Sequence, residues 1–445
     1  MPDTAQDLLA HLIAAARAAG ADAADALIVN STASGVSYRL GKLEDVERSE
    51  SRHLGLRVFV GQRVAFVSSS DLAREAVDGL PERAVAMARL APEDPYAGLA
   101  PAELLATKVP FLDLEDAGEP AVETLIARAK DIEAAAMAVP GVTNSEGGGA
   151  SFGRTAIALA TSEGFFGQYA ATSSSLGVSV LAGEGTGMER DYDGVSARHA
   201  SDLESVSVVG CRAGERAVAR LNPRKAKSAT LPVIFDPRVA GGLLGHFVSA
   251  ISGSAIARGV SFLKDRLGSE VFAPSITIVD DPHRMRGLRS KPFDGEGVRN
   301  RRQNLIDKGV LTSWLLDCAS ARQLGLTTTG HAARGTSGPP APAPTNLYME
   351  PGQLDRAQLI ADIKDGFYVT ELMGMGVNAV TGDYSRGASG FWIESGEIRY
   401  PVSGVTIAGN LKDMFRQLTP ANDLEFRYGT NAPTLRVEGM TIAGA

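Results

Sequence analysis

Six histidines occur in the sequence, and their spacing limits the metal chemistry available to the chain. They are His11, His53, His199, His246, His283 and His331, and no two lie within five residues of each other. A zinc peptidase usually holds its metal with two histidines on adjacent turns of one helix, beside a glutamate that acts as general base. The sequence lacks that pattern, so we expect no catalytic residue and no metal ligand of this kind.

A looser metal site is an alternative. Asp280 and Asp281 shortly precede His283, and His246 could join them from an earlier helix. Such a set would suit an independent metal-dependent hydrolase. However, an Asp-Asp-Pro-His run is also common turn chemistry, in which the side chains accept hydrogen bonds from backbone N–H groups. We favour the turn.

One further run of residues matches a sequence motif of serine hydrolases. The run Gly149-Ala150-Ser151-Phe152-Gly153 matches Gly-x-Ser-x-Gly, but an alternating strand, Arg154–Thr161, follows it. A nucleophile elbow requires a helix there. We therefore interpret the run as a turn bordered by glycines.

A basic cluster follows the histidine-containing turn. It could receive a carboxylate or the acidic surface of a partner, but Asp294 and Glu296 interrupt it, and a solvated loop with internal ion pairs is the favoured interpretation. The cluster consists of Arg284, Arg286, Arg289, Lys291, Arg299, Arg301 and Arg302.

Composition excludes several classes of protein. A net charge of −8 over 445 residues disfavours nucleic-acid binding. Two cysteines, Cys211 and Cys318, cannot form a disulfide framework. The N-terminus has no basic segment ahead of an apolar stretch, and no run of about 18 apolar residues occurs. We expect a cytoplasmic protein that does not bind a membrane.

The patterns of the first half predict helices and short strands. Helices are expected from Asp3 or Thr4 to Gly20, over Asp71–Leu90 with a break or kink at Pro81, and near Ala121–Ala138 and Leu203–Leu221. Strands are expected at Ala26–Asn30, Val36–Leu40, Leu54–Val60 and Val64–Ser68, with a hairpin turn at Gly61-Gln62, and then at Thr155–Ala160 and Leu176–Leu181.

The sequence pattern changes after Pro223–Ser228, which we interpret as a domain boundary. A strand at Leu231–Phe235 precedes a helix at Pro237–Ile251, and further helical patterns lie at Leu354–Ile363 and Leu411–Leu418. The proline-rich stretch Thr327–Thr345 predicts no regular element and is either functional or disordered.

Together these patterns predict an α+β protein. Its N-terminal domain, residues 1–222, mixes helices with small antiparallel meanders, with a division into subregions 1–100 and 120–222 as an alternative. Its larger C-terminal domain, residues 223–445, carries an antiparallel sheet with flanking helices.

A series of distinctive segments runs from Leu231 to Ala443. They are Phe235–Arg238, Gly241–His246, Ala257–Leu263, Lys291–Gly297, Thr345–Tyr348, Gly374–Asn378, Thr381–Trp392, Pro401-Val402 and Thr406–Leu411. Over this range the chain resembles the PmbA branch, also called TldE, of the TldD/PmbA family, and the N-terminal strand Gly55–Phe59 resembles it less specifically.

This resemblance implies a cytosolic two-subunit metallopeptidase, in which a TldD-type chain binds zinc through His-Glu-x-x-x-His and a later cysteine. If His246 is aligned with the first histidine, Phe247 and Ile251 occupy the glutamate and second histidine positions; shifted back by one residue, the three become Gly245, His246 and Ala250. Asp423–Leu435 contains no cysteine. The resemblance therefore implies a subunit without metal, with zinc in the TldD-like partner.

The glycine-rich segment Gly366–Gly390 suggests what such a subunit contributes. Its glycines leave the backbone bare, so that a peptide or a partner could add as a strand; alternatively they serve tight turns between strands. The candidate peptide- or partner-binding residues are His246, Asn378, Asp383, Tyr384 and Arg386.

The sequence-based hypothesis is therefore a PmbA/TldE-like subunit of a metalloprotease complex that acts on unfolded peptides. Its expected partner is a TldD-like chain, in a heterodimer or a larger assembly, and self-association is possible. The alternatives are a non-proteolytic regulator of the DNA gyrase modulator type and an independent hydrolase.

Overall fold

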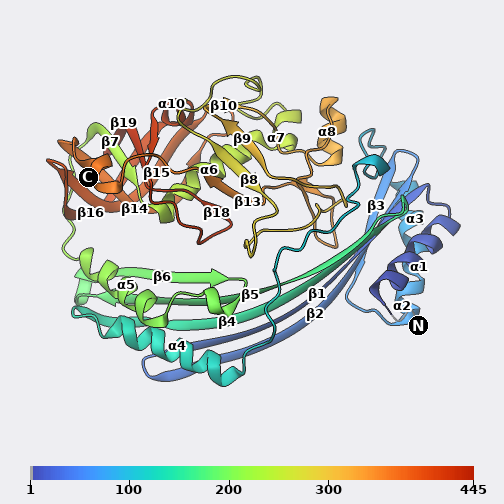
Figure 1. The fold of residues 1–445 in the computed structure, drawn as a ribbon, viewed down its shortest axis with the longest axis horizontal. Helices are drawn as coiled ribbons and strands as arrows, with labels where there is room; N and C mark the ends of the chain where they lie inside the picture. Colours follow the sequence, from blue (N-terminus) through green and yellow to red (C-terminus); the bar gives the residue numbers. More distant parts are fainter. Residues whose placement is uncertain (1–3, 445) are drawn as a thin grey trace.

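A computed structural model describes residues 4–444 and confirms the α+β class. Its first half is one long, curved sheet, and its second half lies over one face of that sheet (Figure 1). The sheet is antiparallel throughout, in the order β3-β2-β1-β4-β5-β6. Its strands are β1 Ala23–Arg39, β2 Lys42–Val60, β3 Arg63–Ser69, β4 Val142–Thr161, β5 Phe166–Ala182 and β6 Glu189–Ala197.

The expectation of small meanders was wrong about strand length. The two strands predicted at Ala26–Asn30 and Val36–Leu40 are parts of a single strand, β1, which runs through Ser31–Gly35. The residues between them are small and mostly polar and lack the apolar alternation of a half-buried strand. However, β1 pairs with β2 on one side and with β4 on the other, and these neighbours supply the backbone hydrogen bonds that keep the segment extended. The hairpin turn at Gly61-Gln62 between β2 and β3 is confirmed.

Helices cover one face of this sheet at both ends. At one end α1 (Ala5–Ala18) packs on β1 and β4, and α3 (Leu80–Leu90) packs on β2 and β3, in a core cluster that includes Leu9 and Leu12 of α1 and Leu54 and Leu56 of β2. At the other end α4 (Val122–Met137) and α5 (Val206–Ala219) cover the alternating apolar residues of β5. The alternation of β5 is the pattern that a strand buried on one face requires.

The helices predicted in this half are confirmed, although their observed ends differ from the predicted ones. Thr4 caps α1 through its side chain, and Asp3, the other proposed cap, lies outside the described residues. The helix predicted at Asp71–Leu90 is two helices, α2 (Arg74–Asp78) and α3. The break predicted near Pro81 is confirmed, and Pro81 lies in the first turn of α3, where its missing N–H costs nothing, so it begins a helix instead of kinking one.

The second half contains a second six-stranded sheet, in the order β16-β15-β14-β7-β19-β17. It is mostly antiparallel, although β7 and β14 are parallel, and it closes on itself because β16 also pairs with β19. Its strands are β7 Ala229–Phe235, β14 Asp365–Val377, β15 Asp383–Glu394, β16 Glu397–Asn410, β17 Leu418–Pro420 and β19 Leu435–Ala443.

A smaller sheet, in the order β10-β9-β8-β13-β18, lies beside it, and helix α6 (Pro237–Ile251) contacts both sheets. The strands of the smaller sheet are β8 Ile278–Asp281, β9 Gln303–Asp307, β10 Val310–Leu311, β13 Asn346–Met349 and β18 Thr430–Asn431. The short helices are α7 Gly253–Ala257, α8 Cys318–Leu324, α9 Arg356–Ile360 and α10 Leu411–Arg416.

The proline-rich stretch Thr327–Thr345 is not wholly irregular. Two short strands, β11 (Ala332–Ala333) and β12 (Ala341–Pro342), pair with each other in it. His331, just before β11, is 2% exposed. The stretch is therefore tied to the body of the molecule.

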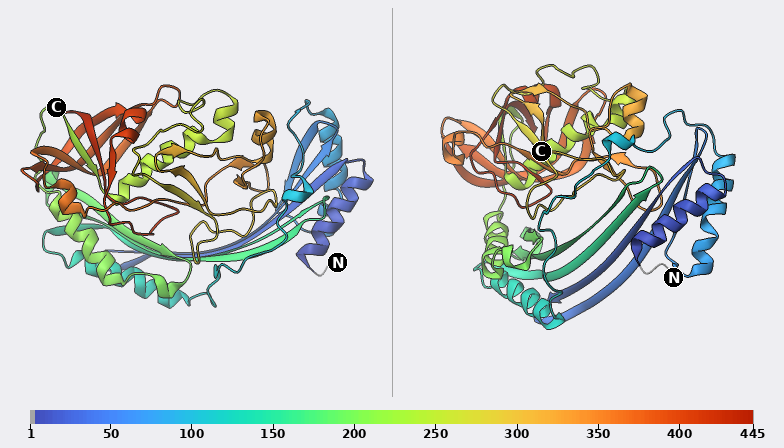
Figure 2. Two further views of the ribbon diagram at one scale, coloured as in Figure 1. Left: turned by 45° about the horizontal axis from the view of Figure 1, so that its top comes forward. Right: turned by 45° about the vertical axis from the view of Figure 1, so that its right-hand side comes forward.

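The two halves meet through buried charges and aromatic rings. Arg334, beside β11, donates to Asp25 of β1 at 2.7 Å, and Asp25 also accepts from Arg57 of β2 at 2.9 Å. Phe165 packs edge-on against Phe293, with ring centroids 5.1 Å apart. Figure 2 shows the second half seated over the curved sheet. The division into domains 1–222 and 223–445 remains a prediction.

Candidate functional site

Helix α6 is the element that positions the candidate site. Asp236 caps its N-terminus by accepting from the N–H of Arg238 at 3.0 Å, and Pro237 occupies its first turn. The bounds predicted for this helix, Pro237–Ile251, are confirmed. One side of α6 is apolar and buried in the core, whereas Gly242, Gly245 and Ser249 are exposed.

His246 lies at the margin of that exposed face. Its partly buried ring packs edge-on against Tyr384 of β15, with centroids 5.9 Å apart. Burial lowers the pKa of His246 below its ordinary value of 6.5, and the charge of Arg386 lowers it further. The imidazole is therefore neutral at physiological pH and presents one proton donor and one acceptor.

The positions around His246 on α6 are part of the hydrophobic core. Phe247 is 0% exposed and packs against Phe272 with ring centroids 5.3 Å apart, and Ile251 is also 0% exposed. In the alternative register, Gly245 carries no side chain and Ala250 is 3% exposed. In neither register does the helix supply a carboxylate or a second imidazole.

Asn378 and Asp383 form the turn between β14 and β15. The side chain of Asn378 accepts from the N–H of Val380 at 2.9 Å, and the carboxylate of Asp383 accepts from the hydroxyl of Thr381 at 2.6 Å. This bond, together with one from Asn410, lowers the pKa of Asp383. Both residues are exposed and remain open to a further contact.

The structure thus brings the five predicted residues to one region. His246, Tyr384 and Arg386 are neighbours, and the turn that contains Asn378 and Asp383 leads directly into β15. Tyr384 is 2% exposed, and its hydroxyl has no hydrogen-bond partner among the described residues. The binding role of all five remains a prediction.

Both interpretations of the glycine-rich segment find support. Gly374 and Gly382 have φ of 75° and 86°, as turns require, and a Cβ on Gly376 or Gly390 would overlap a backbone oxygen of the neighbouring strand. Yet β14 pairs with β7 only over Phe367–Val369, so that the rest of that edge pairs with no described strand. Met375, on this part of β14, is 89% exposed.

The alternative metal set is not assembled. Asp281 accepts from the N–H of His283 at 3.0 Å, which is the expected turn chemistry, and the ring of His283 bonds Asn300 at 2.7 Å. Asp280 accepts from the N–H of Thr345 at 2.6 Å. Among residues 4–444, no three or more His, Cys, Asp or Glu side chains are grouped so that they could hold a metal ion.

The basic cluster is less solvated than expected. Arg286 and Arg302 form ion pairs at the surface, with Asp202 at 3.0 Å and with Glu350 at 3.5 Å. Lys291 instead points inward and donates to the carbonyl of Ala332 at 3.2 Å. Asp294 is 1% exposed, and burial beside Glu296 raises its pKa to about 7. The acids that interrupt the cluster are thus core residues rather than surface counter-ions.

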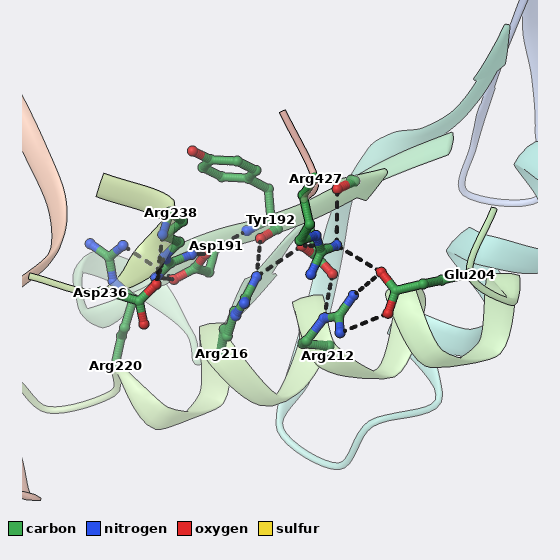
Figure 3. A network of polar contacts seen from close by, with 11 residues as sticks. Asp191, Tyr192, Glu204, Arg212, Arg216, Arg220, Asp236, Arg238 and Arg427 are labelled. Atoms are coloured by element: carbon green, nitrogen blue, oxygen red, sulfur yellow. Dashed lines mark hydrogen bonds and ion pairs between the residues drawn. The ribbon is translucent and has the colours of Figure 1, made fainter. Parts of the chain in front are cut away.

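The sequence did not reveal an ionic network that anchors α6 to the first half. Arg238 binds Asp191 of β6 through two hydrogen bonds, of 2.6 and 3.1 Å, and Arg220 reaches the same carboxylate at 3.4 Å. Arg427 binds Glu204 at 2.9 Å (Figure 3). These partners are distant in sequence and follow no local pattern, so no motif could have indicated them.

Three family models match the chain. They describe the PmbA/TldA metallopeptidase domain 1 at residues 24–88, the central domain at 115–221 and the C-terminal domain at 228–444. The protein belongs to the PmbA/TldD metallopeptidase family.

Within that family the chain is similar to proteins of the PmbA branch. It is 42% identical to the metalloprotease PmbA of Escherichia coli O157:H7 over 95% of this chain and 92% of that protein. It is 37% identical to the metalloprotease PmbA homolog of Haemophilus influenzae, over 92% of this chain and 89% of the homolog.

Solved structures share the fold. A protein of Bacteroides thetaiotaomicron described as a candidate modulator of DNA gyrase superposes with a TM-score of 0.91 at 27% identity, over 99% of this chain and 100% of that one. TldE from Thermococcus kodakarensis superposes with a TM-score of 0.88 at 22% identity, over 98% of this chain and 100% of that one, which supports the fold alone.

No helix among residues 4–444 is both long and apolar enough to cross a membrane.

Proposed function

We propose that this chain is the non-catalytic subunit of a cytoplasmic, two-subunit metallopeptidase that acts on unfolded peptides. A TldD-type partner supplies the zinc, and this chain supplies part of the surface that binds the peptide and the partner. The observation that carries the proposal is the chemistry of α6, where core residues, Phe247 and Ile251, occupy the positions of a general base and a second metal ligand.

The donors present on α6 do not fit a peptidase zinc site. Such a site needs three protein ligands and a carboxylate to accept a proton from the metal-bound water. Here α6 offers one imidazole, and Phe247 and Ile251 help to hold the helix against the core. Replacing either by a charged residue would bury a charge without a partner, so the catalytic donor set is incompatible with this packing.

The region around His246 supports a binding role. The exposed part of the β14 edge that pairs with no described strand can accept an extended segment through backbone hydrogen bonds. Arg386 of the neighbouring strand β15 donates to the carbonyl of Met373 on this part of β14 at 3.1 Å, and Asp383, at the start of β15, provides a charge of the opposite sign. Peptide binding of this kind requires no metal in this chain.

The proposal is tested with the TldD-type chain of the same organism. The two proteins should co-purify in equal amounts, and the peptidase activity of the pair should depend on the His-Glu-x-x-x-His motif of the partner. His246→Ala in this chain should leave the zinc content of the complex unchanged. A complex that loses zinc on this substitution would contradict the proposal.

A further inference from the structure

Strand β6, at the edge of the long sheet, pairs with β5 alone among the described strands. On its other edge, the carbonyls of Tyr192 and Gly194 accept hydrogen bonds from Arg216 at 3.4 Å and from Arg427 at 3.2 Å. Backbone groups alternate in direction along an antiparallel strand. The N–H and C=O of Ser196, two residues after Gly194, therefore point to the same outer edge, where no described backbone group pairs with them.

This part of the edge opens into a cavity of about 450 Å³, a volume within the usual range of ligand pockets. Val195, Ser196 and Ala197 form one wall of it. The segment Arg284–Leu288 and the loop that contains Phe426 and Tyr428 form the other walls. The cavity thus lies between the two halves of the molecule.

Two arginines that line the cavity have no carboxylate partner in the described part of the chain. Arg198 donates to the carbonyls of Gly287 at 3.2 Å and Thr172 at 2.9 Å, and also to that of Leu288. The guanidinium of Arg284 stacks over Phe426, 3.4 Å from the ring centroid. The carbonyls accept the hydrogen bonds of Arg198 and the ring stacks on Arg284, but neither neutralises a positive charge. These two cations therefore favour an anion between them.

The other charges of the cavity are largely balanced. Arg286 pairs with Asp202 at 3.0 Å and Arg427 pairs with Glu204 at 2.9 Å. Glu425 lies on the exposed rim. The uncompensated positive charge is therefore located at Arg198 and Arg284, next to the backbone groups of Ser196.

We propose that this cavity binds a carboxylate-bearing peptide segment, which extends the long sheet by pairing with β6 at Ser196 while its carboxylate is bound by Arg198 and Arg284. This inference rests on the proposed peptide-binding function and specifies its substrate class. Backbone pairing fixes the direction of the peptide, and bidentate guanidinium–carboxylate contacts select for acidic residues.

The test uses the purified chain and three short fluorescent peptides with an otherwise identical β-forming sequence. One carries a central glutamate and an amidated C-terminus, the second has glutamine instead of the glutamate, and the third has the glutamine and a free C-terminal carboxylate. Fluorescence anisotropy should give an affinity for one of the carboxylate peptides at least about ten-fold higher than for the neutral one, the ratio expected for a charge-assisted contact. Whichever of the two carboxylate peptides binds more tightly identifies a side-chain or a terminal carboxylate as the ligand.

Variants separate the charge from the backbone contribution. Arg284→Gln should reduce the affinity for the preferred peptide to that of the neutral peptide, whereas Arg301→Gln, at an exposed arginine of the same basic cluster that does not line the cavity, should not change it. Ser196→Pro removes the outward N–H at a strand edge that tolerates proline, and should weaken all three peptides. Equal affinity for all three peptides, or an unchanged affinity in Arg284→Gln, would overturn the proposal.

The peptidase activity of the complex distinguishes a wrong assignment of the cavity from a wrong assignment of the subunit role. If the complex with the TldD-type chain is active but cleaves acidic and neutral peptides equally, with no effect of Arg284→Gln, the cavity is not the binding site and the subunit role stands. If the complex is inactive on every peptide, the subunit role itself fails.

Discussion

His246 is a residue of a type that can bind zinc, but its surroundings lack the other groups that a peptidase zinc site needs. Its ring is partly buried against Tyr384, and the neighbouring Arg386 disfavours its protonation. A zinc peptidase would need a carboxylate near it, and the adjacent position holds the buried Phe247. We infer that the imidazole serves packing and binding as a neutral group.

This environment predicts a pH dependence of stability. The folded-state pKa of His246 is below its unfolded value of 6.5, so the unfolded chain binds the proton more readily than the folded chain does. The stability that the neutral imidazole contributes is therefore present above pH 6.5 and is lost as the pH falls below 6.5 toward the folded-state pKa. Urea denaturation at about pH 7 and about pH 5 should show a smaller loss for His246→Gln than for the wild type. His53→Gln, at an exposed position of β2, is the control and should lose as much as the wild type. The same loss in all three proteins would contradict this account of His246.

Glycines in the β14–β15 hairpin give a second test at this scale. A Cβ on Gly390 would overlap the carbonyl oxygen of Tyr368, whereas a Cβ on Gly387 would lie 3.4 Å from the side chain of Met373. Gly390→Ala should therefore lower the free energy of unfolding by about 3 kcal/mol or more, and Gly387→Ala by about 1 kcal/mol at most. Thermal or chemical denaturation measures both. Equal effects would mean that close strand packing does not explain Gly390.

At the scale of elements, the ionic network between β6, α5 and α6 fixes the candidate site relative to the long sheet. Asp191 is 1% exposed and accepts from Arg238 and Arg220, which belong to different halves of the molecule. Burial alone would raise the pKa of Asp191, but the two arginines hold it below its ordinary value. The pair is thus ionised, and its loss would leave buried guanidinium groups without a counter-ion.

Asp191→Asn should therefore lower the free energy of unfolding by about 3–5 kcal/mol, the usual consequence of removing one partner of a buried ion pair. The exposed pair Arg190–Glu146, on the same sheet, is the matched control, and Glu146→Gln should cost less than about 1 kcal/mol. Urea denaturation measures both variants. Similar effects at the two sites would show that burial does not decide the contribution of Asp191.

The elements also show what the sequence could and could not predict. Helix α6 was predictable to its ends, because Asp236 and Pro237 are local start signals and the apolar spacing is helical. The continuity of β1 through Ser31–Gly35 was not predictable, because it depends on pairing with β2 and β4 rather than on the apolar pattern of the segment itself. The five candidate residues were found through the resemblance and the glycine-rich segment, whereas the Arg198–Arg284 cavity depends on contacts between distant segments.

At the scale of the whole molecule, the second half lies over the curved sheet of the first and joins it through buried pairs such as Arg334–Asp25. The site around His246 and the cavity beside β6 therefore belong to one framework. We propose that this framework, with core residues at the ligand positions of α6, positions a peptide for a catalytic partner.

In the proposed assembly, metal chemistry reaches the peptide from another chain. The most direct measurement is the zinc content and peptidase activity of this purified protein, alone and after mixing with the TldD-type chain. We predict no stoichiometric zinc and no cleavage by the isolated protein, and chelator-sensitive cleavage by the mixture. Chelator-sensitive cleavage by the isolated protein would contradict the account.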